Sequence, residues 1–508
     1  MTKHACRMMS EESKDKNRKE SILTVERAAW VAVGLLAAGL RLLQLGLRPL
    51  SEAEAVQALA AHRFTHGAAA TAPAAPAGTL PALFTGNVIG FSLLGASDAS
   101  ARWLPALAGL ILVLLPYGLR HRLGRGGALA ASLLLTLSPS TVYFSRTLDS
   151  AILVAASGLA LAFSLLDYLD TQRPSSLYLA AVALGLGLCT GPGTFTLLLI
   201  FAAFALVLYL GERVLGSETG WASLAAAWQA LRSEKGLLPR TGVVAAATFG
   251  LAATAFVLHP AGVGHAADLL GAWALGFLPE PGGEPIIYPL LLLLRYGPLI
   301  LLFGLMEAVW AVLVRRRDPH WWSDRPRSSF PHTAFLAFWT VAAAMVVLVS
   351  GHRPAGNILL VVVPLSLMAG QGIERAWRWV TRRQLWTQTA LFAGAALGLL
   401  AFIYLQVAAY GLASPNTVYK IGEVTLYTTS TYLILASVGL LLLVILGAAA
   451  WMWHGPELVL AGGWLTALIA LGLIGFRAMW GLNYAHASDP RELMIRQATA
   501  PQVRQLVT

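Results

Sequence analysis

Two polar blocks between long apolar stretches carry the residues best suited to acid–base chemistry. The first block is Arg48-Pro49-Leu50-Ser51-Glu52-Ala53-Glu54. A carboxylate beside a hydroxyl group can remove its proton during a transfer reaction, so Glu52 and Glu54 are candidate catalytic residues. Positions two apart on a helix point about 200° apart, so at most one of the two faces a given cavity. Solvation of a surface helix is the alternative explanation for both glutamates.

The second block is Ser145-Arg146-Thr147-Leu148-Asp149-Ser150. Arg146 and Asp149 are three residues apart, a spacing that lets them share one face of a helix. The planar guanidinium group of Arg146 is suited to binding a phosphate or a carboxylate. The pattern predicts that Arg146 and Asp149 form a pair at a phosphate-binding site, although an ordinary salt bridge at a helix end explains the spacing equally well.

Two further arginines lie where a lipid phosphate would meet them. Arg295 lies inside the predicted span 289–314, about one and a half turns from its outer end, and a charge inside a membrane is costly unless it pairs, snorkels or lines a wet cavity. We expect Arg295 to line such a cavity. Arg353 would meet a phosphate at headgroup depth, with interfacial anchoring as the alternative. The expected partners of Arg295 are Asp149, Glu52, Glu54 or a phosphodiester.

Residues that bind metals show no recognisable spacing. The 11 histidines are dispersed, and the 2 cysteines are Cys6 and Cys189. This pattern supports neither a cysteine-based metal site nor a disulfide framework. We therefore predict no cofactor, and a divalent cation has no support from the spacing.

The apolar segments between these polar residues predict the fold. The chain is 57% hydrophobic and 12% charged, with a mean hydropathy of +0.66. A bilayer core is crossed by about 20 apolar residues in a helix. We therefore predict an all-α polytopic membrane protein with about thirteen transmembrane helices. They lie near residues 28–47, 101–119, 127–143, 147–169, 177–191, 193–211, 241–259, 289–314, 332–350, 356–373, 387–410, 431–453 and 458–477.

The basic residues set the predicted orientation. The tail 1–27 and the loops on its side of the membrane carry most of the 36 lysines and arginines, so the positive-inside rule places the N-terminus in the cytoplasm. We expect a disordered tail at 1–27, a membrane domain at 28–477 and an external tail at 478–508. The first external loop, 48–100, would carry a juxtamembrane helix near 80–96, because a span there would invert the basic loops that follow.

The charge distribution and the absence of internal repeats weigh against a nucleic-acid-binding protein and against an ordinary carrier. The net charge of +11 follows from the loop asymmetry, and no basic region is interleaved with aromatic residues, so we expect no nucleic-acid binding. No internal repeat of the transporter type is evident, and no loop is long enough for a separate folded domain. An ordinary carrier is therefore a weaker hypothesis than a membrane enzyme.

Several loop blocks form a recognisable set. They include Ala101-Arg102-Trp103-Leu104-Pro105-Ala106, Leu137-Ser138-Pro139-Ser140, Tyr143-Phe144-Ser145-Arg146, Arg295-Tyr296-Gly297-Pro298-Leu299 and Asn483-Tyr484-Ala485-His486. Together they resemble the GT-C superfamily of membrane glycosyltransferases. Within it, the chain is most similar to the prokaryotic flippase-activity-associated family, which is related to protein O-mannosyltransferases. The likeness extends over roughly residues 28–508.

The resemblance implies a GT-C-like bundle whose first external loop carries the acid that activates an acceptor hydroxyl group. It also implies a polyprenyl-phosphate-linked sugar as donor and a glycan, lipid or protein as acceptor, on the outer face of the plasma membrane. On this basis, we assign Glu54 and Glu52 to catalysis. Donor or phosphate binding is assigned to Arg146, Asp149, Arg295, Arg353 and Tyr288.

Three positions depart from the family pattern. Where the family has Asp-Glu-Ala, this sequence has Ala53-Glu54-Ala55, so Glu52 would have to replace the missing base. The acid of the second block is displaced to Asp149, and Thr79-Leu80-Pro81 lacks the family's histidine.

Relatives continue into a soluble outer domain, whereas this sequence ends at Thr508, as a truncated one would. The alternative is a non-catalytic GT-C-like protein that binds lipid-linked glycans and assists their flipping or delivery.

Overall fold

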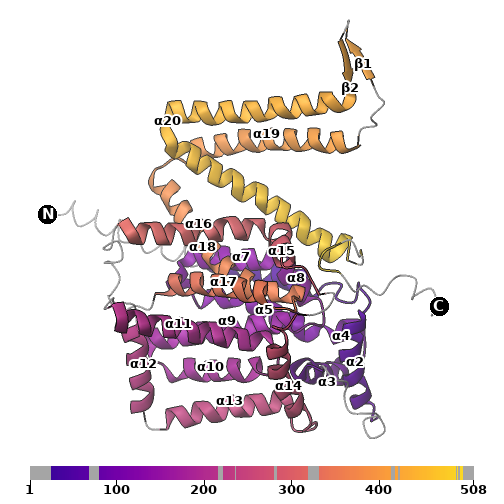
Figure 1. The fold of residues 1–508 in the computed structure, drawn as a ribbon, viewed down its shortest axis with the longest axis vertical. Helices are drawn as coiled ribbons and strands as arrows, with labels where there is room; N and C mark the ends of the chain where they lie inside the picture. Colours follow the sequence, from indigo (N-terminus) through magenta and orange to yellow (C-terminus); the bar gives the residue numbers. More distant parts are fainter. Residues whose placement is uncertain are drawn as a thin grey trace, which may run out of the picture. The chain divides into compact units, whose positions relative to one another are not determined.

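The computed structural model describes residues 25–67, 79–215, 221–234, 236–279, 283–317, 331–412, 418–421, 424–487, 489 and 492–495 (Figure 1). The predicted disordered tail therefore lies largely outside the described residues, as does most of the predicted external tail. The chain forms two compact units. Unit 1 comprises Met1–Gly372 and Phe476–Thr508, and unit 2 comprises Ile373–Gly475.

Unit 1 is helical throughout its described part, beginning with a helix at residues 25–42. Helix α10 packs side by side with α9 and α13, whereas α2 and α3 lie at one end of the bundle and α12 at the other (Figure 1). Proline supplies the first turn of several helices, where its missing N–H group costs nothing. The helices are α2 (Glu52–Thr65), α3 (Pro81–Leu94), α4 (Asp98–Ala101), α5 (Trp103–Leu114), η2 (Leu115–Tyr117), α6 (Arg120–Leu123), α7 (Arg125–Leu137), α8 (Pro139–Ser145), α9 (Ala151–Thr171), α10 (Pro174–Gly187), α11 (Gly193–Leu215), α12 (Trp221–Ser233), α13 (Leu237–Ala253), α14 (Gly262–Leu275), α15 (Tyr288–Tyr296), α16 (Pro298–Arg317), α17 (His332–Val349), η3 (Ala355–Ile358), the first part of α18 (Leu359–Arg382) and the π-helix η4 (Gly481–Ala485).

The chain is a multi-pass membrane protein, and its described residues are helical apart from one short hairpin. Six described helices are long and apolar enough to cross a membrane, and up to nine spans result if three bent pairs each count as one. The predicted thirteen spans are therefore not shown. Two of the predicted spans correspond to the shorter apolar helices Trp103–Tyr117 and Pro174–Gly187.

Two predicted spans are bent at a proline. Helices α7 and α8 meet at 62° next to Pro139, and α15 and α16 meet at 100° next to Pro298. A proline within a helix lacks the N–H group for the ladder and clashes with the preceding turn, so the chain starts a new helix there. Long apolar segments flank both bends, so the average hydropathy predicted single straight spans.

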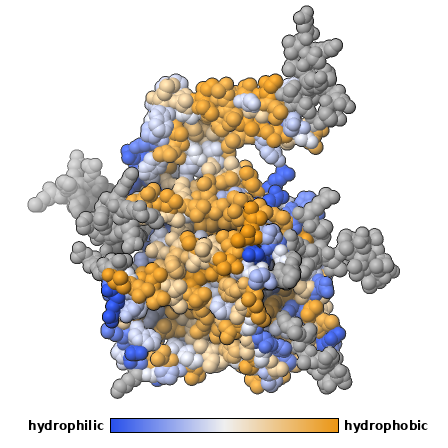
Figure 2. Space-filling model, viewed as in Figure 1, coloured by the Kyte–Doolittle hydropathy of each residue, from blue (hydrophilic) through white to orange (hydrophobic). Residues whose placement is uncertain are grey.

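Unit 2 contains the end of α18, helix α19 (Trp386–Leu412), the strands β1 (Val418–Ile421) and β2 (Val424–Tyr427), and most of α20 (Thr428–Trp480). The antiparallel strands pair Val418 with Tyr427, a hairpin that the all-α prediction missed. Gly455 has a φ of 74°, which glycine adopts without strain, and it divides α20 into two arms that match predicted spans 431–453 and 458–477. Apolar side chains cover much of the visible helical surface (Figure 2).

Candidate functional site

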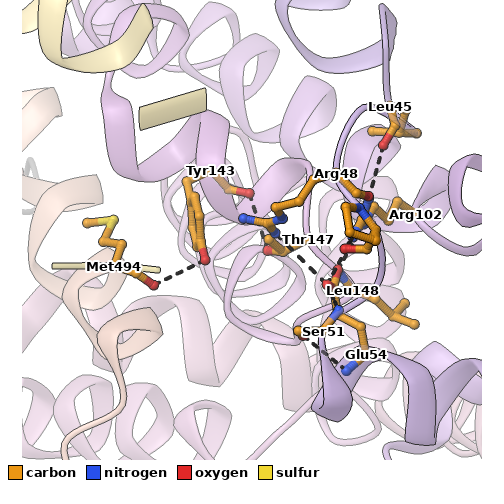
Figure 3. A network of polar contacts seen from close by, with 10 residues as sticks. Leu45, Arg48, Ser51, Glu54, Arg102, Tyr143, Thr147, Leu148 and Met494 are labelled. Carbon is orange, nitrogen blue, oxygen red and sulfur yellow. Dashed lines mark hydrogen bonds and ion pairs between the residues drawn. The ribbon is translucent and has the colours of Figure 1, made fainter. Parts of the chain in front are cut away.

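The centre of the site is a buried ion pair between Glu54 of α2 and Arg102, which precedes α5 (Figure 3). Arg102 Nε donates to Glu54 Oε1 at 2.8 Å, and Arg102 Nη2 donates to Glu54 Oε2 at 2.9 Å. The relative exposure is 4% for Glu54 and 0% for Arg102. A two-pronged guanidinium–carboxylate contact of this kind is a strong charge-assisted interaction.

The local sequence explains why Glu54 points inward. Ser51 caps α2, its side chain accepts from the Glu54 amide, and Glu54 Oε2 accepts from the Ser51 amide at 2.9 Å. This Ser-x-x-Glu capping box fixes the first turn. Glu54, Ala58 and Ala61 form the buried face of α2, whereas Glu52 is exposed on another face, as a separation of about 200° predicts.

Both carboxylate oxygens of Glu54 are fully engaged. Besides Arg102 and Ser51, the amide of Leu148 donates to Oε1 at 2.7 Å. Burial alone would raise the pKa of Glu54, but the hydrogen bonds and charge of Arg102, supported by the charge of Arg48 and the Ser51 amide, hold it below the usual value. Glu54 therefore remains a carboxylate and ties α2 to the turn between α8 and α9.

Arg146 and Arg41 bind the end of the helix at 25–42 and its neighbours. Arg146 donates to the carbonyl oxygens of Leu40, Leu43 and Gln44 at 2.7 to 3.1 Å, and its guanidinium lies 4.7 Å from the ring centre of Tyr484. A cation is favourable at a helix C-terminus, where carbonyl groups lack partners. Arg41 is fully buried and donates to Ser145 Oγ and to the carbonyls of Ala37 and Leu135.

Asp149 does not pair with Arg146 in the described part of the chain, contrary to the pairing that their spacing suggested. Asp149 Oδ1 instead accepts from the amide of Ala151 at 2.7 Å at the start of α9. The side chain is half-buried. Burial raises the pKa of Asp149, the nearby charge of Glu54 raises it further, and the Ala151 amide opposes the shift.

A small cavity of about 20 Å³ lies beside these groups, with room for about one water molecule. Arg48 extends along it between Tyr143 and Glu54 (Figure 3), with its guanidinium 5.0 Å from the Tyr143 ring centre and 3.9 Å from Glu54 Oε2. Three arginines are therefore gathered at one cavity. Its lining residues are Leu45, Leu47, Arg48, Arg102, Tyr143, Arg146, Leu482, Asn483 and Ala487.

The other predicted binding residues hold neighbouring segments. Arg295 is on the exposed end of α15, where the 100° bend takes it out of the predicted straight span, and its side chain is 62% exposed. It approaches Glu492 at 4.0 Å rather than the acids expected from the sequence. Arg353 donates to the carbonyl oxygens of Glu284 and Leu348 and so joins a loop to the end of α17.

Residues 492–495, which we call the C-terminal strap, are fastened by three tyrosines. Tyr143 and Tyr288 donate to the carbonyl oxygens of Met494 at 3.1 Å and Leu493 at 2.8 Å. Tyr296 donates to Glu492 Oε2 at 2.6 Å, and Met494 and Ile495 are buried. Tyr288 was predicted to bind the donor, and here its hydroxyl group holds the strap.

Sequence reasoning overlooked two residues of this site as candidates, Arg102 and Arg48. The capping-box pattern at Ser51 and Glu54 was the local signal that one glutamate would face inward. No local signal identified its partner 48 positions away. Among the described residues, no three His, Cys, Asp or Glu side chains come together as a group that could hold a metal ion.

Comparison with known structures identifies the fold. The crystal structure of ArnT from Cupriavidus metallidurans bound to undecaprenyl phosphate matches with a TM-score of 0.52 at 17% identity, covering 94% of this chain and 80% of that one. The chain has a GT-C-like fold. The apo state of the same protein matches this GT-C-like chain at 17% identity with a TM-score of 0.51, covering 96% of this chain and 81% of that one.

Sequence comparison links part of this GT-C-like chain to one family. Residues 86–232 match the family described as Dolichyl-phosphate-mannose-protein mannosyltransferase. This region includes Arg102, Arg146 and Asp149 but not α2. No curated protein matches the chain. The Archaeoglobus fulgidus oligosaccharyltransferase shares 13% identity over 87% of this chain and 55% of its own, and its TM-score of 0.45 is too low to support an inference.

Proposed function

We propose that this chain is an integral-membrane glycosyltransferase that moves a hexose from a polyprenyl-phosphate-linked donor to a glycan, lipid or protein acceptor. The reaction takes place on the outer face of the plasma membrane, with the N-terminus in the cytoplasm and the C-terminus outside. The observation that carries the proposal is the cluster of arginines at one cavity beside two carboxylates.

The charges around the cavity favour an anionic ligand. Arg41, Arg48, Arg102 and Arg146 lie close together in the bundle, and Glu54 is the carboxylate that pairs with two of them. Backbone carbonyls satisfy the N–H groups of Arg41 and Arg146 but do not cancel their charge. An excess of buried positive charge attracts a phosphate group, and arginine is suited to phosphate recognition.

Among the three arginines at the cavity, Arg48 makes the fewest contacts that hold the structure together. Its side chain makes an ion-pair contact with Glu54 and lies over Tyr143, whereas Arg102 and Arg146 each bind three backbone carbonyl groups. We therefore assign the donor phosphate to Arg48 first, and because the cavity holds only about one water molecule, binding requires the Arg48 side chain to move. Donor-binding roles for Arg295, Arg353 and Tyr288, and a catalytic role for Glu52, stay predictions.

The proposal is tested with protein reconstituted in lipid nanodiscs and a panel of polyprenyl phosphates carrying a tritium-labelled hexose. We expect labelled sugar to reach hydroxyl acceptors, supplied as serine- and threonine-rich peptides and as lipid-linked hexoses. Arg48→Ala should weaken donor binding at least about tenfold, because one charge-assisted contact is worth about 1.5–3 kcal/mol. The matched control is Arg63→Ala, an exposed arginine at the end of α2.

A second candidate is a non-catalytic protein that binds lipid-linked glycans. The observation that favours it is the full engagement of Glu54, together with alanine at position 53 where the resembling family has its base. This candidate predicts donor binding that depends on Arg48 and no transfer to any acceptor. Absence of both transfer and donor binding would refute the two functions together.

A further inference from the structure

Glu54 is poorly placed to accept a proton. Its two oxygens receive four hydrogen bonds, from two nitrogens of Arg102 and the amides of Ser51 and Leu148. Protonating Glu54 would leave Arg102, which has no exposed surface, without its counter-charge. Breaking a buried pair in this way is strongly unfavourable. A base for the proposed transfer must therefore come from elsewhere.

Asp149 has the properties that Glu54 lacks. Oδ1 accepts from the Ala151 amide, whereas no group in the described part of the chain donates to Oδ2, and the side chain is half-buried rather than enclosed. The raised pKa of Asp149 makes its carboxylate a better proton acceptor than an ordinary aspartate. Asp149 also lies within electrostatic range of Tyr143, which lines the arginine cavity.

The surroundings hold Asp149 in place from two sides. Leu148, the residue before it, donates its amide to Glu54 at 2.7 Å, so the buried pair fixes this turn. On the other side is Gly356 of η3, where an added Cβ would lie 3.5 Å from Asp149 Oδ1 and 2.6 Å from the Ala151 Cβ. The missing side chain at Gly356 thus lets η3 pack directly against the start of α9, beside Asp149 Oδ1.

We propose that Asp149 is the catalytic base of the transfer reaction and that Glu54 is a positioning residue that holds it through the Leu148 amide. This inference rests on the proposed function. Asp149 takes the proton of the acceptor hydroxyl group as that oxygen forms a bond to the sugar anomeric carbon. The bond from this carbon to the donor phosphate oxygen breaks, and the polyprenyl phosphate leaves with the electron pair.

The test compares Asp149→Asn, Asp149→Glu and Glu54→Gln in the nanodisc transfer assay, with donor binding measured in parallel. Asp149→Asn should lower kcat by about 10²–10⁴-fold while donor Kd changes less than about twofold, because general-base catalysis is worth that much. Asp149→Glu should restore part of the rate. Asp98→Asn, an acid in α4, is the matched control and should transfer sugar at the wild-type rate.

The pH dependence separates positioning from a purely structural role. The charged and titratable groups around Asp149 are Glu54 of α2 and Tyr143 of α8, since η3 and the first turn of α9 contain none. The charge of Glu54 raises the pKa of Asp149. Glu54→Gln should therefore move the acid limb of the pH profile of kcat to lower pH. A limb that stays in place in Glu54→Gln would overturn the positioning role.

Three outcomes distinguish the inference from the function on which it rests. Wild-type protein that transfers no sugar from any donor would overturn both. Transfer by wild type that is undiminished in Asp149→Asn would overturn the assignment of the base and leave the proposed function standing. Transfer that is lost in Glu52→Gln and kept in Asp149→Asn would return the base to Glu52.

Discussion

The two units use the same pair of residue types in opposite ways. In unit 1, Glu54 and Arg102 are 48 residues apart, and their side chains are 5% and 0% exposed. In unit 2, Glu374 and Arg378 are one helical turn apart on α18, and their side chains are 10% and 59% exposed. Both partners of the first pair lose solvation and the pair joins three segments, whereas in the second pair the guanidinium of Arg378 keeps much of its contact with solvent. Burial, rather than residue type, decides what such a pair does.

The glycines show the same contrast. A Cβ added at Gly109 of α5 in unit 1 would lie 2.0 Å from Ser145 Oγ and 3.0 Å from Arg41 Nε, so the arginine cluster needs the missing side chain. A Cβ added at Gly398 of α19 in unit 2 meets nothing within 4 Å. Packing around the candidate site is therefore tight, whereas this part of α19 presents an open surface within its unit.

The largest expected effect comes from removing one partner of the buried pair. Arg102→Met leaves the Glu54 carboxylate buried without its cation and should lower the free energy of unfolding by about 3–5 kcal/mol. The double variant Arg102→Met/Glu54→Leu should recover most of this loss, because no buried charge remains. Chemical unfolding in detergent, followed by tryptophan fluorescence, measures both, and a loss below about 1 kcal/mol in the single variant would contradict the comparison.

Gly109→Ala should have the next largest effect. The added methyl group must displace Ser145 and Arg41, and overpacking of this kind costs about 1–3 kcal/mol. Gly398→Ala is the matched variant, and it should be neutral or stabilise α19 by up to about 1 kcal/mol, since alanine is the better helix former. Unfolding curves of the two variants, measured side by side, test the difference, and equal losses would refute it.

Acid should weaken unit 1 through Glu54. Its pKa is lower in the folded protein than in the unfolded chain, so its contribution is fully present above the ordinary glutamate pKa and is lost as pH falls through the folded value. Each unit of depression is worth about 1.4 kcal/mol. Stability measured from pH 7 into the acid range should fall less steeply in Arg102→Met/Glu54→Leu than in wild type. Identical slopes would show that Glu54 does not carry this dependence.

The smallest effect is expected for the pair on α18, of which Arg378 is exposed. Arg378→Gln removes, at its exposed partner, an ion pair between positions i and i+4 on α18, and such pairs contribute about 0.3–0.5 kcal/mol. The free energy of unfolding should change by no more than this, and less at high salt, where screening is stronger. A loss above about 1 kcal/mol would mean that the two pairs are more alike than their exposures indicate.

The sequence predicted much of the helical fold and part of the site. Long apolar runs predicted the helices, and the spacing of Glu52 and Glu54 predicted that they would face apart. Pairings between distant positions carry no local signal, so Arg102 and the contact of Arg295 with Glu492 were not predicted. The bends at Pro139 and Pro298 did have a local signal, but the long apolar segments on both sides outweighed it in the prediction.

The C-terminal strap has a mechanical consequence. Tyr143 donates to the carbonyl oxygen of Met494 with its hydroxyl group, while its ring lies 5.0 Å from the guanidinium of Arg48. One rigid side chain thus bears on the strap at one end and on the arginine cavity at the other. Tension applied to the chain at Ile495 would reach Arg48 through this ring, so a pull on the C-terminal segment is a pull on the proposed phosphate contact.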